Sequence, residues 1–302
     1  MSISNGECEQ KCADASAPDQ SFTISRLAAP FGAEITGLDA GKRLSDTDFA
    51  RVHDAFQNEH VLVLRDQRIT PSQHIELSRR FGKLMIHALH QFHLPGHPEI
   101  LCISNIIENG QPTGLGDAGR YWHSDISYQA IPSMGSLLHA QEVPDEGGDT
   151  LFADMHLAFE SLPEALRTAV EGKRAFHSYL DRYIERQTDA RYWPTLTPQQ
   201  VAQLSQVTHP IVRTHQGNGR KALFVSEGFT TRIEGMPEDE SKAVLRELFA
   251  HSVKPQHIYR HRWQNHDLLF WDNRSLVHCA TACPGHLRRK LHRTTIEGEI
   301  PR

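Results

Sequence analysis

The spacing of hydrophobic residues in the first third of the chain predicts two helices with a buried strand between them. Apolar side chains in residues 45–60 recur on one helical face, behind a serine that can cap the helix N-terminus. The Val-Leu-Val-Leu run at residues 61–64 is typical of a buried strand. Residues 70–82 begin with Thr-Pro-Ser-Gln, which is the signature of a capping box, and end at a glycine, so they predict a second helix. Apolar pieces at residues 22–24 and 33–35 add two short strands.

Beyond about residue 98 the pattern favours strands. They are expected at residues 100–104, 136–143, 149–152, 211–214, 222–225, 258–263, 267–271 and 290–296. Helical spacing is confined to residues 155–162, 163–170 and 238–251. Strands this short and this regularly interrupted disfavour a parallel α/β sheet. We therefore expect a mainly β fold with flanking helices, of the antiparallel sandwich or jelly-roll type.

Stretches without a hydrophobic period suggest how the chain is organised. Residues 1–20 are polar and are expected to form a disordered leader, and residues 21–302 are expected to form a single domain. Residues 181–208 are polar, aromatic and rich in glutamine, which predicts a lid or an oligomer-forming insertion within that domain. We expect a homo-oligomer, either a dimer or a tetramer.

Composition narrows the classes of function. Hydrophobic residues make up 38% of the 302 residues, and no apolar run approaches the roughly 20 residues of a membrane helix, so no membrane partner is expected. The net charge of −5 gives no drive toward nucleic acid. The N-terminus lacks a signal peptide, and the five cysteines lack the spacing of a zinc site. Together these features predict a cytoplasmic protein with free thiols.

The most informative segment is Tyr121-Trp122-His123-Ser124-Asp125. If it forms a strand, His123 and Asp125 point to the same face and can offer an imidazole nitrogen and a carboxylate oxygen to one ion. Alone, a His-x-Asp pair is weak evidence in a chain with 20 histidines, because two surface residues give the same pattern.

A second segment strengthens the interpretation. The apolar strand that ends at Trp271 should deliver His278 just beyond it, and Arg289 follows eleven residues later. Two histidines and one carboxylate on one face of an octahedral metal are the arrangement of non-haem Fe(II) oxygenases. A nearby arginine can hold a carboxylate co-substrate in bidentate fashion. The combination predicts such a centre far more specifically than either segment does.

The sequence resembles the taurine dioxygenase / 2,4-dichlorophenoxyacetate dioxygenase family of Fe(II)- and 2-oxoglutarate-dependent oxygenases, over about residues 22–301. The matching segments are Phe81-Gly82-Lys83-Leu84, Trp122-His123-Ser124-Asp125, Gly147-Gly148-Asp149-Thr150, Arg232-Ile233-Glu234-Gly235-Met236, Trp271-Asp272-Asn273 with His278, and the arginine-rich end. The resemblance implies a double-stranded β-helix, which is a jelly roll, with His123, Asp125 and His278 as the Fe(II) ligands. It also implies that Thr150 and Arg289 bind the distal carboxylate of 2-oxoglutarate.

The implied reaction consumes O2 and 2-oxoglutarate, releases succinate and CO2, and hydroxylates a small organic substrate. The resemblance puts His87 and Arg293 where taurine-type enzymes hold a sulfonate, and a local cationic pair in a chain of net charge −5 favours an anionic substrate. His90 and Gly119 stand where taurine enzymes carry tyrosine and asparagine. A different sulfonate, an alkyl sulfate or an aryloxyalkanoate therefore fits at least as well as taurine, with cleavage of the C–S or C–O bond after hydroxylation.

Other residues near these segments are expected to serve structure. Trp122 and Trp271 should pack behind the ligand-bearing segments, and Arg288 should face solvent. Asp272 and Asn273 should cap the strand end through local hydrogen bonds.

Two other functions remain open at this point. A zinc hydrolase could use the same ligands, although the chain has no His-Glu-x-x-His motif. A non-catalytic jelly-roll binding module would keep the fold without turnover, but such a module has no need of His123, Asp125, His278 and Arg289 together.

Overall fold

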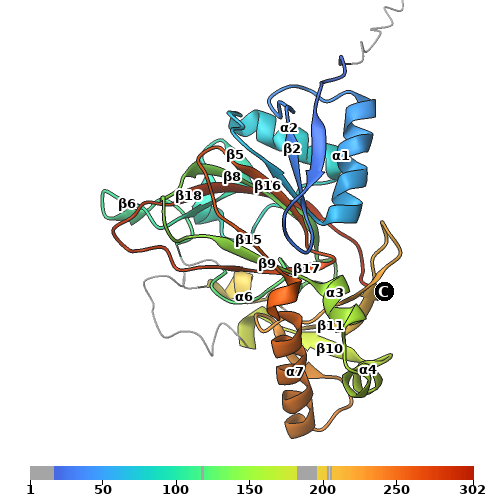
Figure 1. The fold of residues 1–302 in the computed structure, drawn as a ribbon. Helices are drawn as coiled ribbons and strands as arrows, with labels where there is room; N and C mark the ends of the chain where they lie inside the picture. The colour runs from blue at the N-terminus through green and yellow to red at the C-terminus, as the bar shows by residue number, and fades with distance from the viewer. Residues whose placement is uncertain (1–16, 117–118, 182–195, 203, 205) are drawn as a thin grey trace, which may run out of the picture.

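Two β-sheets lie face to face at the centre of the molecule, as the computed structural model shows (Figure 1). The structure describes residues 17–116, 119–181, 196–202, 204 and 206–302. The larger sheet has eight strands in the spatial order β1 (Thr23–Arg26), β2 (Ala33–Thr36), β3 (Val61–Leu64), β16 (Leu268–Asp272), β8 (Ser133–Glu142), β18 (Lys290–Glu297), β5 (His97–Ser104) and β4 (His93–Leu94). The smaller sheet has the order β15 (Ile258–His261), β9 (Thr150–Asp154) and β17 (Leu276–Ala280). Neighbouring strands in these two sheets are antiparallel except β2 and β3.

Side-chain alternation along the large sheet builds two separate cores. Val61 and Val63 of β3 share one apolar cluster with Phe152 of the small sheet, between the two sheets. Leu62 and Leu64 share another cluster with the helices on the outer face. Because both faces of β3 are buried, the strand carries no polar residue.

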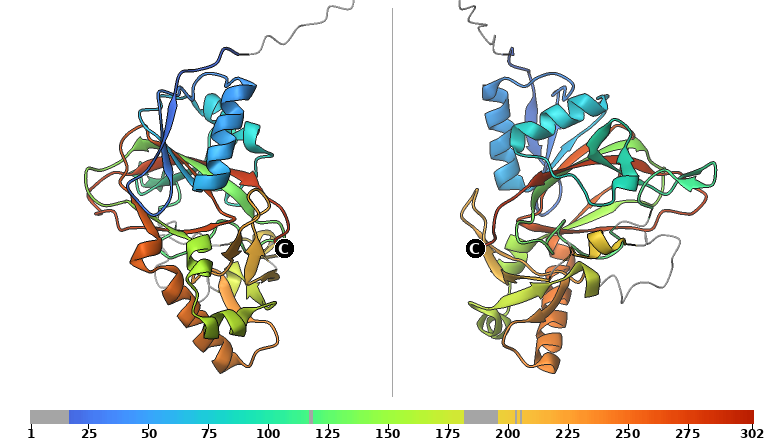
Figure 2. Two further views of the ribbon diagram at one scale, coloured as in Figure 1. Left: turned by 45° about the vertical axis from the view of Figure 1, so that its right-hand side comes forward. Right: turned by 180° about the vertical axis from the view of Figure 1, so that it is seen from behind.

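Two helices, α1 (Asp46–Glu59) and α2 (Pro71–Phe81), cover the outer face of the large sheet (Figure 2). The Oγ of Ser45 accepts a hydrogen bond from the Asp48 N–H at 3.0 Å and caps α1. Thr70 and Gln73 form the reciprocal capping box at the start of α2. The sequence prediction of both helices, including their caps, is confirmed.

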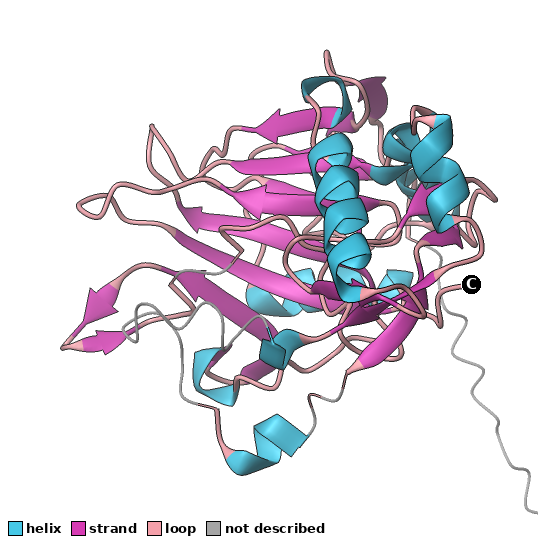
Figure 3. Ribbon diagram, turned by 90° about the horizontal axis from the view of Figure 1, so that it is seen from below, coloured by secondary structure: helices cyan, strands magenta, loops and turns pink. Residues whose placement is uncertain are grey.

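A second group of elements packs beside the small sheet around a third apolar cluster. It contains a sheet of order β11 (Val207–Pro210), β10 (Arg174–His177), β14 (Thr230–Ile233), and the hairpin β12 (Val212–Thr214) with β13 (Lys221–Leu223). Its helices are α3 (Met155–Glu160), α4 (Glu164–Val170) and α7 (Glu238–Ser252). The remaining short elements are η1 (His90–Phe92), β6 (Ile107–Glu108), β7 (Gln111–Pro112), α6 (Pro198–Ala202) and η2 (Pro255–His257). Figure 3 shows strands filling the middle of the molecule, with helices around them.

Three sequence expectations about secondary structure were wrong. His278 does not lie just beyond a strand that ends at Trp271, because the chain turns after Asp272 and His278 sits inside a new strand, β17. Asp125 is in a turn and not in a strand. Strands β10 and β14 were not expected, since their four-residue sequences have no clear alternation.

Some expectations fall partly outside the described residues. Residues 1–16 of the expected leader lie outside the described residues. Asp19 and Gln20 are described, and they bond to Ser45 and Asp48 at the start of α1. Within the expected insertion at 181–208, residues 182–195, 203 and 205 also lie outside the described residues. Cys102, Cys279 and Cys283 are free thiols, as predicted, and Cys8 and Cys12 lie outside the described residues. Among the helices of the described ranges, none has the length and apolar character needed to cross a membrane.

Candidate active site

His123 and His278 lie side by side because their backbones form an antiparallel pair. The His123 N–H donates to the His278 carbonyl at 3.0 Å, and the His278 N–H donates to the His123 carbonyl at 2.8 Å. The centroids of the two rings are consequently 4.1 Å apart. Strand β9 holds β17 from its other edge, where Phe152 is the register partner of His278.

Asp125 completes this group from the turn that follows His123. Its Oδ1 lies 3.6 Å from Nε2 of His123 and 4.0 Å from Nε2 of His278. All three side chains are buried, and their candidate ligand atoms lie within 4.8 Å of one another. The predicted meeting of these residues is confirmed, although a turn and not the expected strand produces it.

The protonation of the group suits a metal. The Nδ1 of His123 donates to the Tyr121 carbonyl at 2.8 Å, so the other ring nitrogen, Nε2, is the one placed to bind a metal. Burial and the neighbouring His123 lower the pKa of His278 well below its ordinary value, so this ring is neutral at pH 7. Burial opposes ionisation of Asp125, but the Arg293 guanidinium and the histidines outweigh it and hold the pKa of that carboxyl well below its usual range. Two imidazoles and one carboxylate are a donor set that fits a divalent transition metal.

A pocket joins this group to the other predicted binding residues. Its polar lining residues are His123, His278, Thr150, Arg289 and Arg293, and its apolar lining includes Leu138 and Trp271. The structure therefore brings together residues from β9, β17 and the β18 region that lie far apart in the chain.

Thr150 and Arg289 are arranged to donate to an anion. The Thr150 Oγ1 accepts from Trp263 Nε1 at 3.0 Å, and since an indole can only donate, the threonine hydroxyl proton is free to be donated elsewhere. Burial lowers the pKa of Arg289 to about 10, so its guanidinium stays charged at pH 7. Its Nε donates to the Gly148 carbonyl at 3.0 Å, and no ion pair of Arg289 is found among the described residues.

Gly148 is required by this arrangement. Its φ is +67°, and a Cβ there would lie 2.9 Å from Cδ and 3.0 Å from Nε of Arg289. The second glycine of the Gly147-Gly148 pair thus lets the backbone approach the arginine and accept from it.

Arg293 faces the metal-binding group directly. Its Nη1 donates to Asp125 Oδ1 at 2.9 Å, while its Nε is buried without a hydrogen-bond partner in the described part of the chain. Arg293 lines the pocket, and this buried nitrogen is a donor that has no acceptor among the described residues.

The expected cationic pair of His87 and Arg293 is corrected in part. Burial and the nearby Arg293 lower the pKa of His87 to about 3, so His87 is neutral at pH 7. Its Nδ1 accepts from the Leu89 N–H at 3.2 Å, which leaves Nε2–H as a donor. Arg293 is also already paired with Asp125, so the site is not an uncompensated positive charge before a metal binds.

The other expectations have mixed outcomes. His90 is exposed in η1, where its ring packs against His93 at 5.0 Å, and it is not among the residues that line the pocket. Arg288 is exposed and pairs with Glu142, as expected. Trp271 is buried and its ring lies 4.9 Å from that of His278. Asn273 makes the expected local bond, because its Oδ1 accepts from Trp271 Nε1 at 3.0 Å, but its side chain also makes long-range bonds to Asp125 and to serines of β8.

Aromatic residues that the sequence did not single out surround one side of His123. The rings of Tyr121 and Phe229 lie 5.1 and 5.8 Å from the His123 ring, and Tyr128 packs on Phe229 at 4.9 Å. These residues share an apolar cluster with Ile126, next to the group formed by His123, Asp125 and His278. Nothing in the linear sequence connects Phe229 with residues 121–128, which explains why the cluster was missed.

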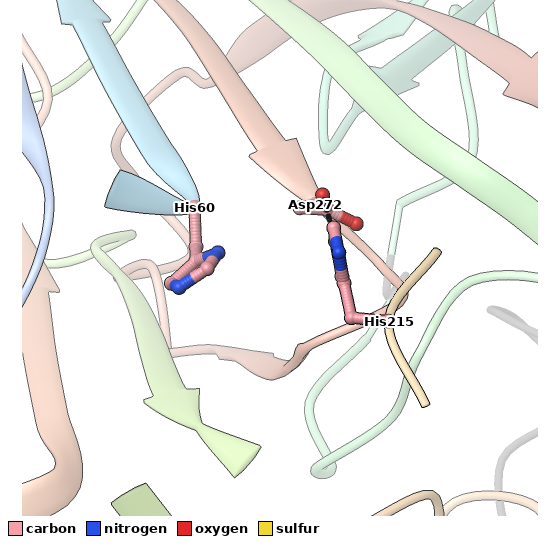
Figure 4. A group of neighbouring side chains, drawn as sticks. All are labelled: His60, His215 and Asp272. Atoms are coloured by element: carbon pink, nitrogen blue, oxygen red, sulfur yellow. Dashed lines mark hydrogen bonds and ion pairs between the residues drawn. The ribbon is translucent and has the colours of Figure 1, made fainter. Parts of the chain in front are cut away.

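A second group with metal-like composition, His60, His215 and Asp272, lies elsewhere in the core (Figure 4). Its hydrogen bonds argue against a metal. The Nδ1 of His215 accepts from two backbone N–H groups, so its Nε2 carries the proton that it donates to Asp272 at 2.9 Å. Both carboxylate oxygens of Asp272 also accept from Arg274, at 2.9 and 2.6 Å. We interpret this group as a structural ion-pair network at the end of β16.

The sequence comparisons agree with this geometry. The sequence model described as "Taurine catabolism dioxygenase TauD, TfdA family" matches residues 23–295. An alpha-ketoglutarate-dependent 2,4-dichlorophenoxyacetate dioxygenase of Cupriavidus pinatubonensis is 34% identical over 286 residues, which cover 91% of this chain and 97% of that protein.

Solved structures give the same result. A taurine dioxygenase of Burkholderia xenovorans superimposes with a TM-score of 0.77 at 30% identity, covering 93% of this chain and 92% of that one. The structure of AAD-2 in complex with Mn(II) and N-oxalylglycine also has a TM-score of 0.77, at 29% identity, and covers 93% of this chain and 99% of that one. On this evidence the chain belongs to the TauD/TfdA family of dioxygenases.

Proposed function

We propose that the protein is an Fe(II)- and 2-oxoglutarate-dependent dioxygenase that hydroxylates a small anionic organic molecule. The observation that carries the proposal is the single pocket into which His123, His278, Thr150, Arg289 and Arg293 all project, with Asp125 beside it. A zinc hydrolase or a binding module has no use for a second, carboxylate-binding end in the same pocket.

His123, Asp125 and His278 would hold Fe(II), which when bound supplies the oxidising chemistry with O2 and 2-oxoglutarate. Three ligands on one face leave the other face open for the co-substrate and O2. Arg289 and Thr150 would donate to the far carboxylate of 2-oxoglutarate and so fix its orientation. Leu138 and Trp271 form apolar walls of the pocket, which would limit the access of water to the metal.

Charge balance favours a substrate with one negative charge. A divalent metal, Asp125, Arg289 and Arg293 together carry a formal charge of about three positive units, and 2-oxoglutarate supplies two negative ones. A monoanionic substrate would neutralise the remainder, with the Arg293 guanidinium, which lines the pocket, as its cationic partner. His87 is not among the lining residues and would act as a neutral donor near Arg293. The exposed His90 would contact substrate only from the rim of the pocket.

The names of the relatives point to the same substrate class. One relative acts on 2,4-dichlorophenoxyacetate and a structural neighbour on taurine, two small molecules that carry a carboxylate and a sulfonate group respectively. We propose a sulfonate, an alkyl sulfate or an aryloxyalkanoate for this protein, with C–S or C–O cleavage after hydroxylation and release of succinate and CO2.

The finer points of organisation are also proposals. The two facing sheets and the relatives support a double-stranded β-helix in a single domain of residues 21–302. We further propose a cytoplasmic homo-oligomer, with residues 181–208 as its lid or contact segment.

An anaerobic titration of the metal-free protein tests the central proposal. Addition of Fe(II) and then 2-oxoglutarate should produce a visible metal-to-ligand charge-transfer band. Zn(II) in place of Fe(II) gives the colourless control. If the band is absent while the protein remains folded by circular dichroism, the proposal fails.

Replacing Arg289 should weaken binding of 2-oxoglutarate selectively. The Arg289→Ala variant loses a charge-assisted bidentate contact worth a few kcal/mol, so the 2-oxoglutarate concentration for half-maximal turnover should rise by roughly 100-fold or more. The matched control is Arg288→Ala, which removes a neighbouring arginine that is exposed and paired with Glu142. Similar behaviour of the two variants would show that Arg289 does not bind the co-substrate.

Substrate charge can be tested through Arg293. Succinate production should be stimulated by taurine, alkanesulfonates, alkyl sulfates or aryloxyalkanoates, and much less by uncharged analogues of the same size. In Arg293→Gln this preference for anions should fall by about 10-fold or more, since one charge-assisted contact is lost. A clear preference of the unaltered protein for a neutral compound contradicts the anion proposal and leaves the metal proposal intact.

A further inference from the structure

A set of buried polar groups lies behind Asp125 and is hydrogen-bonded to it. Ser133, Ser136 and Asn273 are at most 1% exposed, and all three bond to Asp125, to one another, or to both. Ser133 and Ser136 belong to β8, and Asn273 lies in the turn between β16 and β17. Strand β17 contains His278. The group therefore connects the turn of one metal-binding residue with the strand of another.

The direction of each hydrogen bond in this group follows from donor chemistry. The Nε1 of Trp271 can only donate, and it lies 3.0 Å from Asn273 Oδ1, so that atom is the amide oxygen. The amide nitrogen of Asn273 then donates to Ser133 Oγ at 2.8 Å and toward Ser136 Oγ at 3.3 Å. Because Ser136 Oγ receives this bond, its own proton points at Asp125 Oδ2, 2.7 Å away.

Asn273 fixes the backbone of the same residue. Its Oδ1 accepts from the Asp125 N–H at 3.2 Å, and Ser133 Oγ donates to the Asp125 carbonyl at 3.1 Å. The position of the Asp125 Cα and the rotation of its carboxylate are thus set by one connected set of bonds.

The two carboxylate oxygens of Asp125 consequently have different surroundings. Oδ2 is occupied by Ser136, whereas Oδ1 faces the two histidine nitrogens and Arg293. A carboxylate that binds through both oxygens would take a fourth position on the metal, which the co-substrate or O2 needs.

We propose that Ser136 and Asn273 are positioning residues that hold Asp125 in a one-oxygen binding mode through Oδ1. This inference rests on the proposed metal site, and the residues act through Asp125 without touching the metal. Removing the Ser136 hydroxyl frees Oδ2 to turn toward the metal. Changing Asn273 to aspartate keeps the shape but removes the N–H donor, so the Ser136 proton is drawn to residue 273 and away from Asp125.

The test is binding of Co(II) alone to the metal-free protein, followed by its visible d–d spectrum. In Ser136→Ala and in Asn273→Asp the Kd for Co(II) should change by about 10- to 100-fold, which is the usual effect of groups behind a metal ligand, and the bands should shift. The double variant should resemble the stronger single variant, because both changes break the same chain of bonds.

Ser78→Ala is the matched control, since Ser78 is equally buried but bonds to His74 and Thr294 on the helix side of the large sheet. It should keep the wild-type Kd and spectrum, and its Tm gives the cost of losing a buried hydroxyl. If Ser136→Ala folds and binds Co(II) with the wild-type Kd and spectrum, the positioning role is wrong. If the unaltered protein itself does not bind Co(II), the metal proposal fails instead.

Discussion

Replacing any one of His123, Asp125 and His278 by alanine is expected to abolish Fe(II)-dependent consumption of 2-oxoglutarate. Each would supply one of the three donor atoms that lie together among the described residues, and two donors would not hold Fe(II) with a defined open face. The Asp125→Ala variant should be the most severe, because it also removes the only negative charge of the group and leaves Arg293 buried without its partner. The measurement is succinate release under limiting Fe(II).

A histidine on the other face of the same sheet provides the control for these variants. His292 is buried next to Arg293 in β18, but its ring faces away from the pocket, toward the side of His139 and His97. His292→Ala should therefore retain Fe(II)-dependent turnover at a temperature where it is folded. Full activity of the His123, Asp125 or His278 variant under limiting Fe(II) would show that this residue is not a metal ligand.

Acid is expected to destabilise the metal-free protein strongly below about pH 6.5. Several buried histidines outside the pocket are kept neutral, chiefly by burial. The pKa is lowered to about 3 for His60, His74 and His177, and to about 4 for His156, His209 and His292. In the unfolded chain these rings titrate near pH 6.5.

The free energy of unfolding falls as the pH falls because the unfolded state binds more protons than the native state. Below about pH 6.5 the unfolded state takes up protons that the native state refuses, so the contribution of these histidines is complete above that pH and declines as the pH falls toward their native pKa values. Each ring contributes a slope of about 1.4 kcal/mol per pH unit, against a total stability of about 5–15 kcal/mol. Asp154 offsets one such slope, because burial raises its pKa to about 6 and it binds a proton in the native state.

Urea unfolding followed by circular dichroism between pH 7.5 and pH 5 measures this effect. The free energy of unfolding should be flat above about pH 6.5 and drop by several kcal/mol by about pH 5. His60→Gln should make the decline shallower, because it removes one ring whose pKa is lowered by burial. The change breaks no side-chain hydrogen bond, since neither ring nitrogen of His60 has a partner in the described residues. His286→Gln changes an exposed ring and is the control. A stability that stays constant down to pH 5 would contradict this account.

Local features of the sequence were sufficient to predict much of the fold. Helices α1 and α2 were predicted with their caps because capping uses residues within three positions of each other. Strand β3 was predicted because burial on both faces removes all polar residues from it. Strands β10 and β14 were missed because each is short and is stabilised by pairing with the other and not by its own pattern.

The residues of the candidate site were predicted, but not the way in which they meet. His123, Asp125, His278 and Arg289 were predicted from residue type and spacing, and Thr150 and Arg293 from the family resemblance. The backbone pair between His123 and His278 and the turn at Asp125 were not foreseen, since both depend on segments far apart in the chain. The charge of His87 was also misjudged, because burial and Arg293 together set its pKa.

Residue types, their spacing and the family resemblance were therefore enough to predict which side chains form the candidate site. The tertiary structure alone decided the state of those side chains. Burial, together with the neighbouring His123 and Arg293, lowers the pKa of His278 and of His87 and makes both rings neutral. The packing of β8 against the turn at Asn273 directs one oxygen of Asp125 to Ser136 and the other to the histidines. The physical reason is that a pKa and a hydrogen-bond direction depend on distances in space, which spacing along the chain does not specify.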